Sequence, residues 1–312
     1  MKKWIWIGIS ITVALFVIAG GMLFYAYHSL KHTAKQVYEP LPSDTPRYVS
    51  RDTEVKPLNK VETGKLAPFT ALILGVDERE HDRGRSDTIL ILTVNPQTHK
   101  VLMFSIPRDT RTEIAGKGVQ DKINHAYAFE EVAGSIRTVE NFLDMPIDYY
   151  VEVNMEGFEA VVNILGGVDV HNPFAFDYLG SSFRKGPLHL NGELALKYSR
   201  MRFDDPRGDF GRTERQRQIV SDVIRRAAQW NNALELPKVL KSVEKYVRTN
   251  MTFGEMQDLA LKYRQKIGTI ETTEIEGKGA MIGGIYYFIV DQTERDRIHD
   301  AMKQALKTNA AG

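Results

Sequence analysis

Aspartates and arginines stand at the ends of three short apolar segments, and their residue types suit phosphate and metal chemistry. The segments, residues 72–76, 89–94 and 101–106, are rich in β-branched residues and bounded by turn signals, which is typical of buried strands. The charged residues beside them are Asp77, Arg79, Arg85, Asp87 and Arg108. If the three strands are neighbours, two carboxylates and three guanidiniums converge on one edge of a sheet, where open α/β sheets usually bind ligands.

Asp77 and Asp87 are candidate ligands of a divalent cation. Mg²⁺, or Mn²⁺ in its place, takes oxygen ligands, and in proteins one or two carboxylates with water and substrate phosphate often complete its shell. The alternative is that Asp87 is a turn residue bonding its own backbone and that Asp77 pairs with Arg79 on the surface. Spacing alone does not separate these two interpretations.

A second group of arginines lies about a hundred residues further along the chain. Its members are Arg200, Arg202, Arg207, Arg212, Arg215 and Arg217. Guanidiniums match phosphate oxygens with planar pairs of donors, and they stay charged when partly buried. Arg200 and Arg202 share a face if their segment is extended. Beside two carboxylates, such a cluster suits a pyrophosphate and its metal, whereas Arg215 and Arg217 fit better on a solvated helix face.

Arg108 and Gln216 are two further candidates. Arg108 lies between Pro107 and Asp109 after an apolar strand, which favours a functional role. Thr213 and Gln216 have the spacing of a capping box, in which the glutamine returns to the backbone amide of the threonine. The start of a helix also attracts phosphate, so both roles of Gln216 stay open.

The elements that position these residues are expected to alternate between strands and helices. Apolar spacing predicts helices over 124–143, 158–165, 191–196, 237–249, 254–266 and 293–306, and one beginning at Thr213; further strands are predicted over 149–153, 168–171, 269–275 and 285–290. The expected fold class is therefore α/β, a layered α-β-α domain with a central mixed sheet. Four aromatic residues in the loop 172–186 either plug a core edge or form the lip of an apolar groove.

The N-terminal segment predicts one transmembrane helix before this domain. Residues 4–27 contain no charged residue, and this run of 24 exceeds the roughly 20 residues that span a bilayer. Lys2 and Lys3 precede the run and favour a cytoplasmic N-terminus, with the bulk of the chain outside. Residues 1–27 are thus interpreted as cytoplasmic tip and anchor of a single-pass membrane protein. The proline-rich residues 28–68 are expected to be an extended stalk, and residues 69–312 the extracellular domain.

Composition narrows the classes of function. The 312 residues include 43% hydrophobic and 26% charged residues, enough for a large core, and the formal net charge is +1, which argues against nucleic-acid binding. There is no cysteine, so thiol catalysis and disulfides are excluded. The sequence also lacks the P-loop, dinucleotide, zincin and nucleophile-elbow motifs.

Seven ordered motifs resemble the LytR-CpsA-Psr family of Gram-positive cell-wall proteins, and especially its Bacillus members that attach wall teichoic acid. They are VDER (76–79), RSDT (85–88), NP (95–96), SIPRDT (105–110), LGGVDV (165–170), GxxALxYSRMR (192–202) and DFGRxxRQ (209–216). The resemblance implies a phosphotransferase that moves an anionic glycopolymer from a polyprenyl (undecaprenyl) pyrophosphate carrier to the 6-hydroxyl of N-acetylmuramic acid in peptidoglycan.

The resemblance also implies roles for individual residues. Asp77 and Asp87 would hold Mg²⁺, and the pyrophosphate would be bound by Arg85, Arg108, Arg200, Arg202 and Gln216, with Arg79 and Arg212 next in line. Arg85, Arg108 and Asp87 are the expected catalytic residues, and Asp209 would position Arg212. The family further implies an apolar tunnel for the prenyl chain. Two alternatives stay open: a polyprenyl-pyrophosphate hydrolase that uses water as acceptor, and a non-catalytic membrane-tethered lipid-binding regulator.

Overall fold

A computed structural model describes residues 28–42, 47–55, 57, 66–77, 84–229 and 241–307. The predicted membrane span over 4–27 lies outside these ranges, as does Arg79. Within the described ranges, no helix has the length and apolar character needed to cross a bilayer.

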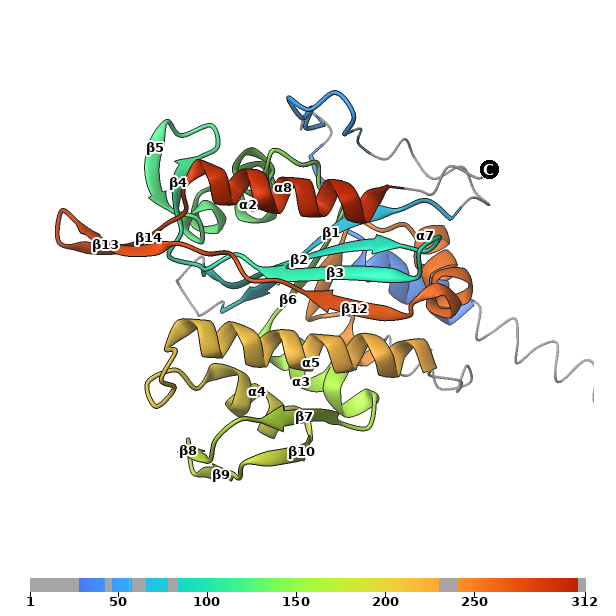
Figure 1. Ribbon diagram of the computed structural model, residues 1–312. Helices are drawn as coiled ribbons and strands as arrows, with labels where there is room; N and C mark the ends of the chain where they lie inside the picture. Colours follow the sequence, from blue (N-terminus) through green and yellow to red (C-terminus); the bar gives the residue numbers. More distant parts are fainter. Residues whose placement is uncertain are drawn as a thin grey trace, which may run out of the picture.

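A six-stranded mixed sheet forms the centre of the domain (Figure 1). In spatial order its strands are β11 (Val247–Thr249), β6 (Tyr149–Val153), β1 (Phe69–Val76), β2 (Ser86–Asn95), β3 (Lys100–Ser105) and β12 (Thr269–Thr272). Strands β1, β2 and β3 pair antiparallel in sequence, whereas β6 runs parallel to β1 and β12 parallel to β3. The three predicted opening strands and the mixed sheet are thus confirmed.

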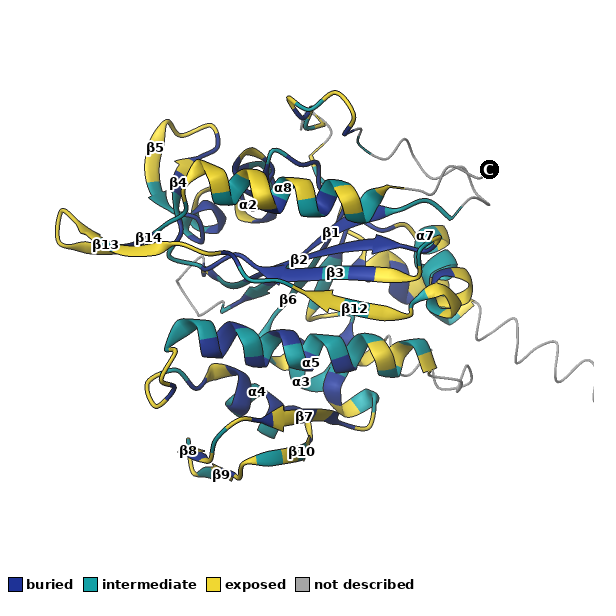
Figure 2. Cartoon of the chain, viewed as in Figure 1, coloured by how far each residue is buried: buried dark blue, intermediate teal, exposed yellow. Residues whose placement is uncertain are grey.

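Helices cover both faces of this sheet, as the predicted α-β-α layering requires. On one face lie α2 (His125–Leu143) and α8 (Gln292–Leu306), packed on a core that contains Leu72, Leu74 and Ile91. On the other lie α5 (Asp209–Gln229), α7 (Phe253–Asp258) and the short turns η1 (Leu259–Tyr263) and η2 (Arg264–Lys266). Figure 2 shows β1, β2 and β3 largely buried between the two layers.

Helix α5 also forms one wall of a further core cluster on the side away from the sheet (Figure 1). The elements there are α3 (Met155–Ile164), β7 (Val168–Asn172), β8 (Phe176–Tyr178), β9 (Ser181–Phe183), β10 (Gly186–Leu190) and α4 (Gly192–Arg200). Phe176 and Phe183, both buried, stack at 4.9 Å between ring centroids. These two rings of the aromatic loop plug a core edge, the first of the two expected roles.

Several expected elements differ from those observed. Residues 247–249, expected in a helix, form the edge strand β11, and β12 pairs with β3 and not with the next strand along the chain. The predicted strand over 285–290 is confirmed as β14 (Ile285–Ile289), but its partner β13 (Lys278–Ile282) and the hairpin of β4 (Arg111–Ile114) with β5 (Val119–Lys122) were not expected. These strands are short and half exposed, so they lack the apolar runs that reveal buried strands.

The expected stalk begins as part of the folded domain. Residues 28–37 are helical, and Ala34 and Val37 are buried. The backbone N–H of Glu39 donates to the carbonyl of Thr249 at 2.8 Å, and the Tyr150 hydroxyl donates to the carbonyl of Glu39 at 2.7 Å. The proline content predicted that all of residues 28–68 form an extended stalk. Residues 28–39 instead pack beside β6 and β11.

Candidate functional site: an arginine and aspartate cluster

The sheet brings the three charged strand ends to one edge. Val76 of β1 lies opposite Ser86 of β2, and the backbone N–H of Asp77 lies 3.4 Å from the carbonyl of Arg85. The turn after β3 follows at the same edge, because the N–H of Ile106 donates to the carbonyl of Ile89 in β2 at 2.9 Å. The strand ends that carry Asp77, Asp87 and Arg108 therefore lie at one edge of the sheet, as the strand pattern predicted.

Arg108 pairs with Asp87 across this edge. Its Nη1 lies 2.7 Å from Oδ1 of Asp87, and its Nε lies 4.0 Å from Oδ2 of Asp109. Burial works to lower the pKa of Arg108, but the hydrogen bond and charge of Asp87 outweigh it and raise that pKa. The buried Nε makes no hydrogen bond within the described residues, so the guanidinium keeps a donor for a further acceptor.

The backbone around Arg108 is fixed from three sides. The N–H of Thr110 donates to the carbonyl of Pro107 at 2.9 Å and closes the turn, and the N–H of Phe288 in β14 donates to the carbonyl of Asp109 at 2.8 Å. The N–H of Asn124 donates to the carbonyl of Arg108 at 3.3 Å. Arg108 is therefore presented by a rigid turn, the arrangement that binding a charged group requires.

Helix α5 contributes the second half of the cluster. Arg212, in its first turn, pairs with Asp209 at 3.0 Å, and its Nη2 donates to the backbone carbonyl of Asp87 at 3.5 Å. Burial lowers the pKa of Arg212, and the charge of Asp209 opposes this effect. Arg202 lies 3.6 Å from the same carboxylate. Arg108, Arg202 and Arg212 thus gather around Asp87 and Asp209, although the two groups are about a hundred residues apart in sequence.

Arg85 and Arg200 lie at the margins of this cluster. The side chain of Arg85 is exposed at the sheet edge. Arg200 is also exposed, and its Nη1 lies 3.5 Å from Sδ of Met155 at the start of α3. The extended conformation in which Arg200 and Arg202 would share a face does not occur, because α4 continues to Arg200 and buries Tyr198 completely. Arg200 and Arg202 therefore do not share the face of a strand.

The expected capping box of Thr213 and Gln216 is also wrong. Helix α5 begins at Asp209, one turn earlier, and the Thr213 hydroxyl donates to the carbonyl of Phe210 at 2.9 Å. Gln216 therefore lies in the second turn, one turn beyond Arg212 on the same face. Its buried Oε1 accepts no hydrogen bond within the described part of the chain. The capping role therefore does not apply, and the role of Gln216 toward a phosphate stays a prediction.

Arg215 and Arg217, expected on a solvated face, are buried with 2% and 5% of their surface exposed. Arg215 pairs with the buried Asp205, and its Nε donates to the carbonyl of Tyr198 at 3.1 Å. Arg217 pairs with Glu274 after β12. Asp205 lies directly over α5 at Gly211, where a Cβ would meet its Oδ2 at 1.8 Å. Arg215 therefore holds the loop 201–208 that carries Arg202.

Two residues of the site were not found by sequence reasoning. Asp109, whose Oδ1 pairs with Lys122 of β5 at 2.6 Å, holds the turn that presents Arg108. Asp205 fixes the loop of Arg202 through Arg215. The pairing of β4 with β5 brings Lys122 to the site, and no spacing rule reveals such a contact between distant residues.

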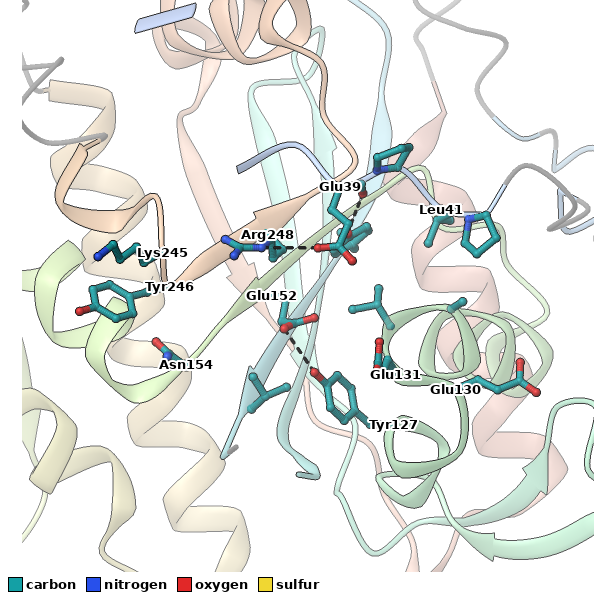
Figure 3. A pocket seen from close by; sticks show the side chains of 16 residues that line it. Glu39, Leu41, Tyr127, Glu130, Glu131, Glu152, Asn154, Lys245, Tyr246 and Arg248 are labelled. Atoms are coloured by element: carbon teal, nitrogen blue, oxygen red, sulfur yellow. Dashed lines mark hydrogen bonds and ion pairs between the residues drawn. The ribbon is translucent and has the colours of Figure 1, made fainter. Parts of the chain in front are cut away.

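A cavity of about 410 Å³ opens beside Val76, the residue before Asp77 (Figure 3). Val76, Leu41, Val132 and Tyr150 contribute apolar or aromatic wall, whereas four carboxylates line other parts of it: Glu39, Glu130, Glu131 and Glu152. Arg248 lies 3.5 Å from Glu39, and the Tyr127 hydroxyl donates to Glu152 at 3.2 Å. The cavity has mixed walls, in contrast to the apolar tunnel that the resemblance implies.

The sheet edge offers two carboxylates, and not a larger group, as ligands for a hard cation. No group of three or more acidic or histidine side chains that could hold a metal occurs among the residues that the structure describes. Asp77 and Asp87 nonetheless stand at adjoining strand ends. Two carboxylates completed by water and phosphate oxygens are a ligand set that Mg²⁺ accepts.

Comparison with known proteins shows the family to which this fold and this cluster belong. The chain belongs to the LytR_cpsA_psr family, whose family model matches residues 24–304. Among its relatives, the polyisoprenyl-teichoic acid–peptidoglycan teichoic acid transferase TagU of Bacillus subtilis is 44% identical over 307 residues, which cover 98% of this chain and 97% of the relative.

Solved structures extend this likeness to the fold. The crystal structure of Bacillus subtilis TagU has a TM-score of 0.65 and 44% identity, covering 79% of this chain and 100% of that one. The family protein YwtF (TagT), solved with bound octaprenyl pyrophosphate lipid, has a TM-score of 0.64 and 27% identity over 86% of this chain and 99% of that one. A protein of the same fold therefore binds a prenyl pyrophosphate.

Proposed function

We propose that this protein is a teichoic acid transferase, which moves a polyisoprenyl-linked teichoic acid onto peptidoglycan. The observation that carries the proposal is the convergence of Arg108, Arg202 and Arg212 around Asp87 and Asp209. Planar guanidiniums at the edge of a sheet match the oxygens of a pyrophosphate. The relatives' activity and the prenyl pyrophosphate bound by a protein of this fold support the same substrate class.

In the proposed reaction the arginines bind and neutralise the pyrophosphate. A hydroxyl oxygen of the acceptor, which we assign to the 6-hydroxyl of N-acetylmuramic acid, forms a bond to the phosphorus on the glycopolymer side. The bridging P–O bond breaks, polyprenyl phosphate leaves, and the hydroxyl proton is released. Phosphoryl transfer depends mainly on positioning and charge stabilisation, so Arg108 and Arg212 can support it without a nucleophilic side chain.

Asp77 and Asp87 are the residues that would hold Mg²⁺ or Mn²⁺ in this proposal, where the cation would supply further neutralisation of phosphate charge. In the structure Asp87 forms an ion pair with Arg108. The Arg108 guanidinium, whose Nε has no acceptor among the described residues, would bind the pyrophosphate. The roles of Arg79, Arg85, Arg200 and Gln216 toward the pyrophosphate belong to the same proposal.

We further propose that residues 4–27 anchor the protein in the cell membrane as a single span, with a cytoplasmic N-terminus and an extracellular catalytic domain. The uncharged run of 24 residues after Lys2 and Lys3 supports this topology. Accessibility of a reporter fused to each end of the chain in intact cells tests it. A reporter at the C-terminus that is accessible only after lysis would contradict the topology.

The test of the function is a product analysis with the full-length protein in detergent micelles. A polyprenyl pyrophosphate-linked teichoic acid precursor is supplied with peptidoglycan oligosaccharide, and the products are identified by mass spectrometry. The proposal expects a phosphodiester between polymer and oligosaccharide together with polyprenyl phosphate. Cleavage with water alone, even in the presence of acceptor, would identify a hydrolase, and binding of precursor without any cleavage would identify a regulator.

A further inference from the structure

A polar groove of about 490 Å³ lies along α5, and no residue of the arginine and aspartate cluster lines it. It runs between α5, β7 and the end of β12, and its polar lining includes His171, Gln218, Ser221 and Thr272. Its volume falls within the range of about 300–1,000 Å³ that is usual for small-ligand sites. None of these four residues belongs to the proposed pyrophosphate site.

A single loop links the groove to that site. Arg207, which lines one end, lies in the same loop between α4 and α5 as Arg202. Along α5, Arg212 and Gln216 share one face, whereas Glu214, Gln218, Ser221 and Arg225 follow at spacings of three and four on another. A ligand in the groove would therefore lie along the helix whose first turns hold the pyrophosphate site.

The charges of the groove are balanced, in contrast to those of the arginine and aspartate cluster. Three arginines, Arg207, Arg217 and Arg225, are matched by three acidic residues, Asp169, Glu214 and Glu274. They are also paired locally: Arg207 lies 2.5 Å from Glu214, Arg217 pairs with Glu274, and Arg225 lies 3.2 Å from Asp222. Paired charges give a polyanion such as teichoic acid no net attraction.

The groove instead offers hydrogen bonds to an uncharged polar ligand. Ser221 and Thr272 supply hydroxyls, and His171 supplies an exposed ring. The buried Oε1 of Gln218 accepts no hydrogen bond within the described residues, although its Nε2 lies 3.5 Å from Glu214. A buried acceptor left without a donor is costly, and a hydroxyl or N-acetyl amide of a sugar would satisfy it.

We infer that this groove binds the glycan strand of the acceptor and directs its hydroxyl toward the phosphorus. The inference rests on the proposed transferase function, and it names the sugar backbone of peptidoglycan as the ligand. The glycopolymer of the donor is also a saccharide, but it is anionic beyond its linkage, and the balanced charge of the groove favours the neutral strand. Gln218, Ser221 and Thr272 are binding residues in this assignment.

The experiment compares Ser221→Trp with the wild-type protein, both full length in detergent micelles. The indole fills the groove without removing a charge. Calorimetric titration with a soluble peptidoglycan tetrasaccharide, in the absence of donor, measures binding directly, and steady-state kinetics give separate KM values for donor and acceptor. The expected result is at least about a tenfold loss of tetrasaccharide affinity and a similar rise in the acceptor KM, with an unchanged donor KM.

The matched control is Ser182→Trp, the same substitution at an exposed position of β9 outside the groove. It should leave both KM values unchanged, and equal melting temperatures of the two variants show that both fold. Gln218→Ala, a smaller change, should weaken tetrasaccharide binding in the same direction.

Tetrasaccharide affinity and acceptor KM that stay at wild-type values in Ser221→Trp and Gln218→Ala would overturn the inference. A rise in the donor KM alone would also overturn it, because the groove would then hold the donor's polymer. If the wild type transfers nothing, the proposed function fails, whereas the calorimetric titration still decides whether the groove binds the glycan.

Discussion

At the scale of single residues, the site separates arginines that face a ligand from arginines that hold the fold. Arg108 keeps a buried Nε without an acceptor among the described residues, whereas Arg215 is satisfied by Asp205 and by backbone carbonyls. The two residue types are identical, and only their surroundings differ. A basic cluster in a sequence therefore does not reveal which of its members act on a substrate.

Arg108→Ala is expected to reduce transfer by about 10²–10³-fold, because it removes one positioned donor from the charge that develops in the reaction. The fold should lose less than about 1 kcal/mol, since the partner Asp87 is 38% exposed and can be solvated. Turnover and urea unfolding measure the two effects. Arg215→Ala is the matched control and should cost about 3–5 kcal/mol of stability, because it leaves Asp205 buried and unpaired. Wild-type turnover in Arg108→Ala would refute the site assignment.

Asp87→Asn is expected to weaken Mn²⁺ binding at least about tenfold, because a charged oxygen ligand is lost. Titration of the full-length protein with Mn²⁺, followed by electron paramagnetic resonance, measures this without any turnover. Chelator should abolish the activity of the wild type. Unchanged Mn²⁺ affinity in the variant, or full activity in excess chelator, would exclude Asp87 as a metal ligand.

At the scale of elements, secondary structure was predicted most accurately for segments that are buried on both sides. Strands β1, β2 and β3 were visible because residues such as Leu72, Ile91 and Phe104 are apolar in unbroken runs. Helix starts were predicted less well: α5 begins at Asp209 because Asp205, Gly211 and Arg215 pack the preceding loop onto its first turns, a contact made in space. The capping box that begins α7, between Thr252 and Glu255, is by contrast a contact between residues close in sequence.

The same distinction explains which parts of the site were predictable. Asp77, Asp87 and Arg108 adjoin strands, so their meeting at one edge followed from the strand pattern. The exclusion of Arg200 from the cluster depended on how far α4 continues, which the burial of Tyr198 decides. Residue types therefore revealed the chemistry, whereas the extent of helices decided which residues lie within the cluster.

Helix α2 contains a buried acid whose titration should affect stability. Glu140 accepts a hydrogen bond from the N–H of Ile147 at 3.0 Å, and burial raises the pKa of Glu140 to about 7. The pKa of Glu140 is higher in the folded than in the unfolded protein, so its contribution to the free energy of unfolding is complete below about pH 4.5. This contribution is lost as the pH rises through about 7.

Glu140→Gln keeps an acceptor for Ile147 and removes the charge. Relative to the wild type, the variant should gain stability between pH 5 and pH 8, by up to about 3 kcal/mol at the upper end. Urea unfolding at several pH values gives this difference. A difference that stays constant across the range would show that Glu140 does not titrate there.

At the scale of the whole molecule, the segment after the predicted anchor is part of the domain. Within residues 28–37, Ala34 and Val37 are buried. The backbone N–H of Glu39 donates to the carbonyl of Thr249, and the carbonyl of Glu39 accepts from the Tyr150 hydroxyl. The predicted membrane span over 4–27 is therefore followed directly by residues that pack on the domain. In the proposed topology, the domain would be held close to the bilayer by residues 28–39.

A chain truncated to begin at residue 43 should be less stable than one that begins at residue 28. The loss should be at least about 2 kcal/mol, because a buried valine and its neighbours no longer cover the domain. Thermal unfolding of the two truncated chains measures the difference. Equal melting temperatures would show that residues 28–42 contribute nothing to the fold.

Helix α5 has a role that depends on its regular geometry. It carries Arg212 and Gln216 on one face and Gln218 and Ser221 on another, and it is packed on both sides. Because successive residues of a helix turn by about 100° and advance by about 1.5 Å, the spacing between donor and acceptor would be set by helical pitch. One residue inserted between Gln216 and Ser221 would misalign the two substrates while leaving each half-site chemically intact.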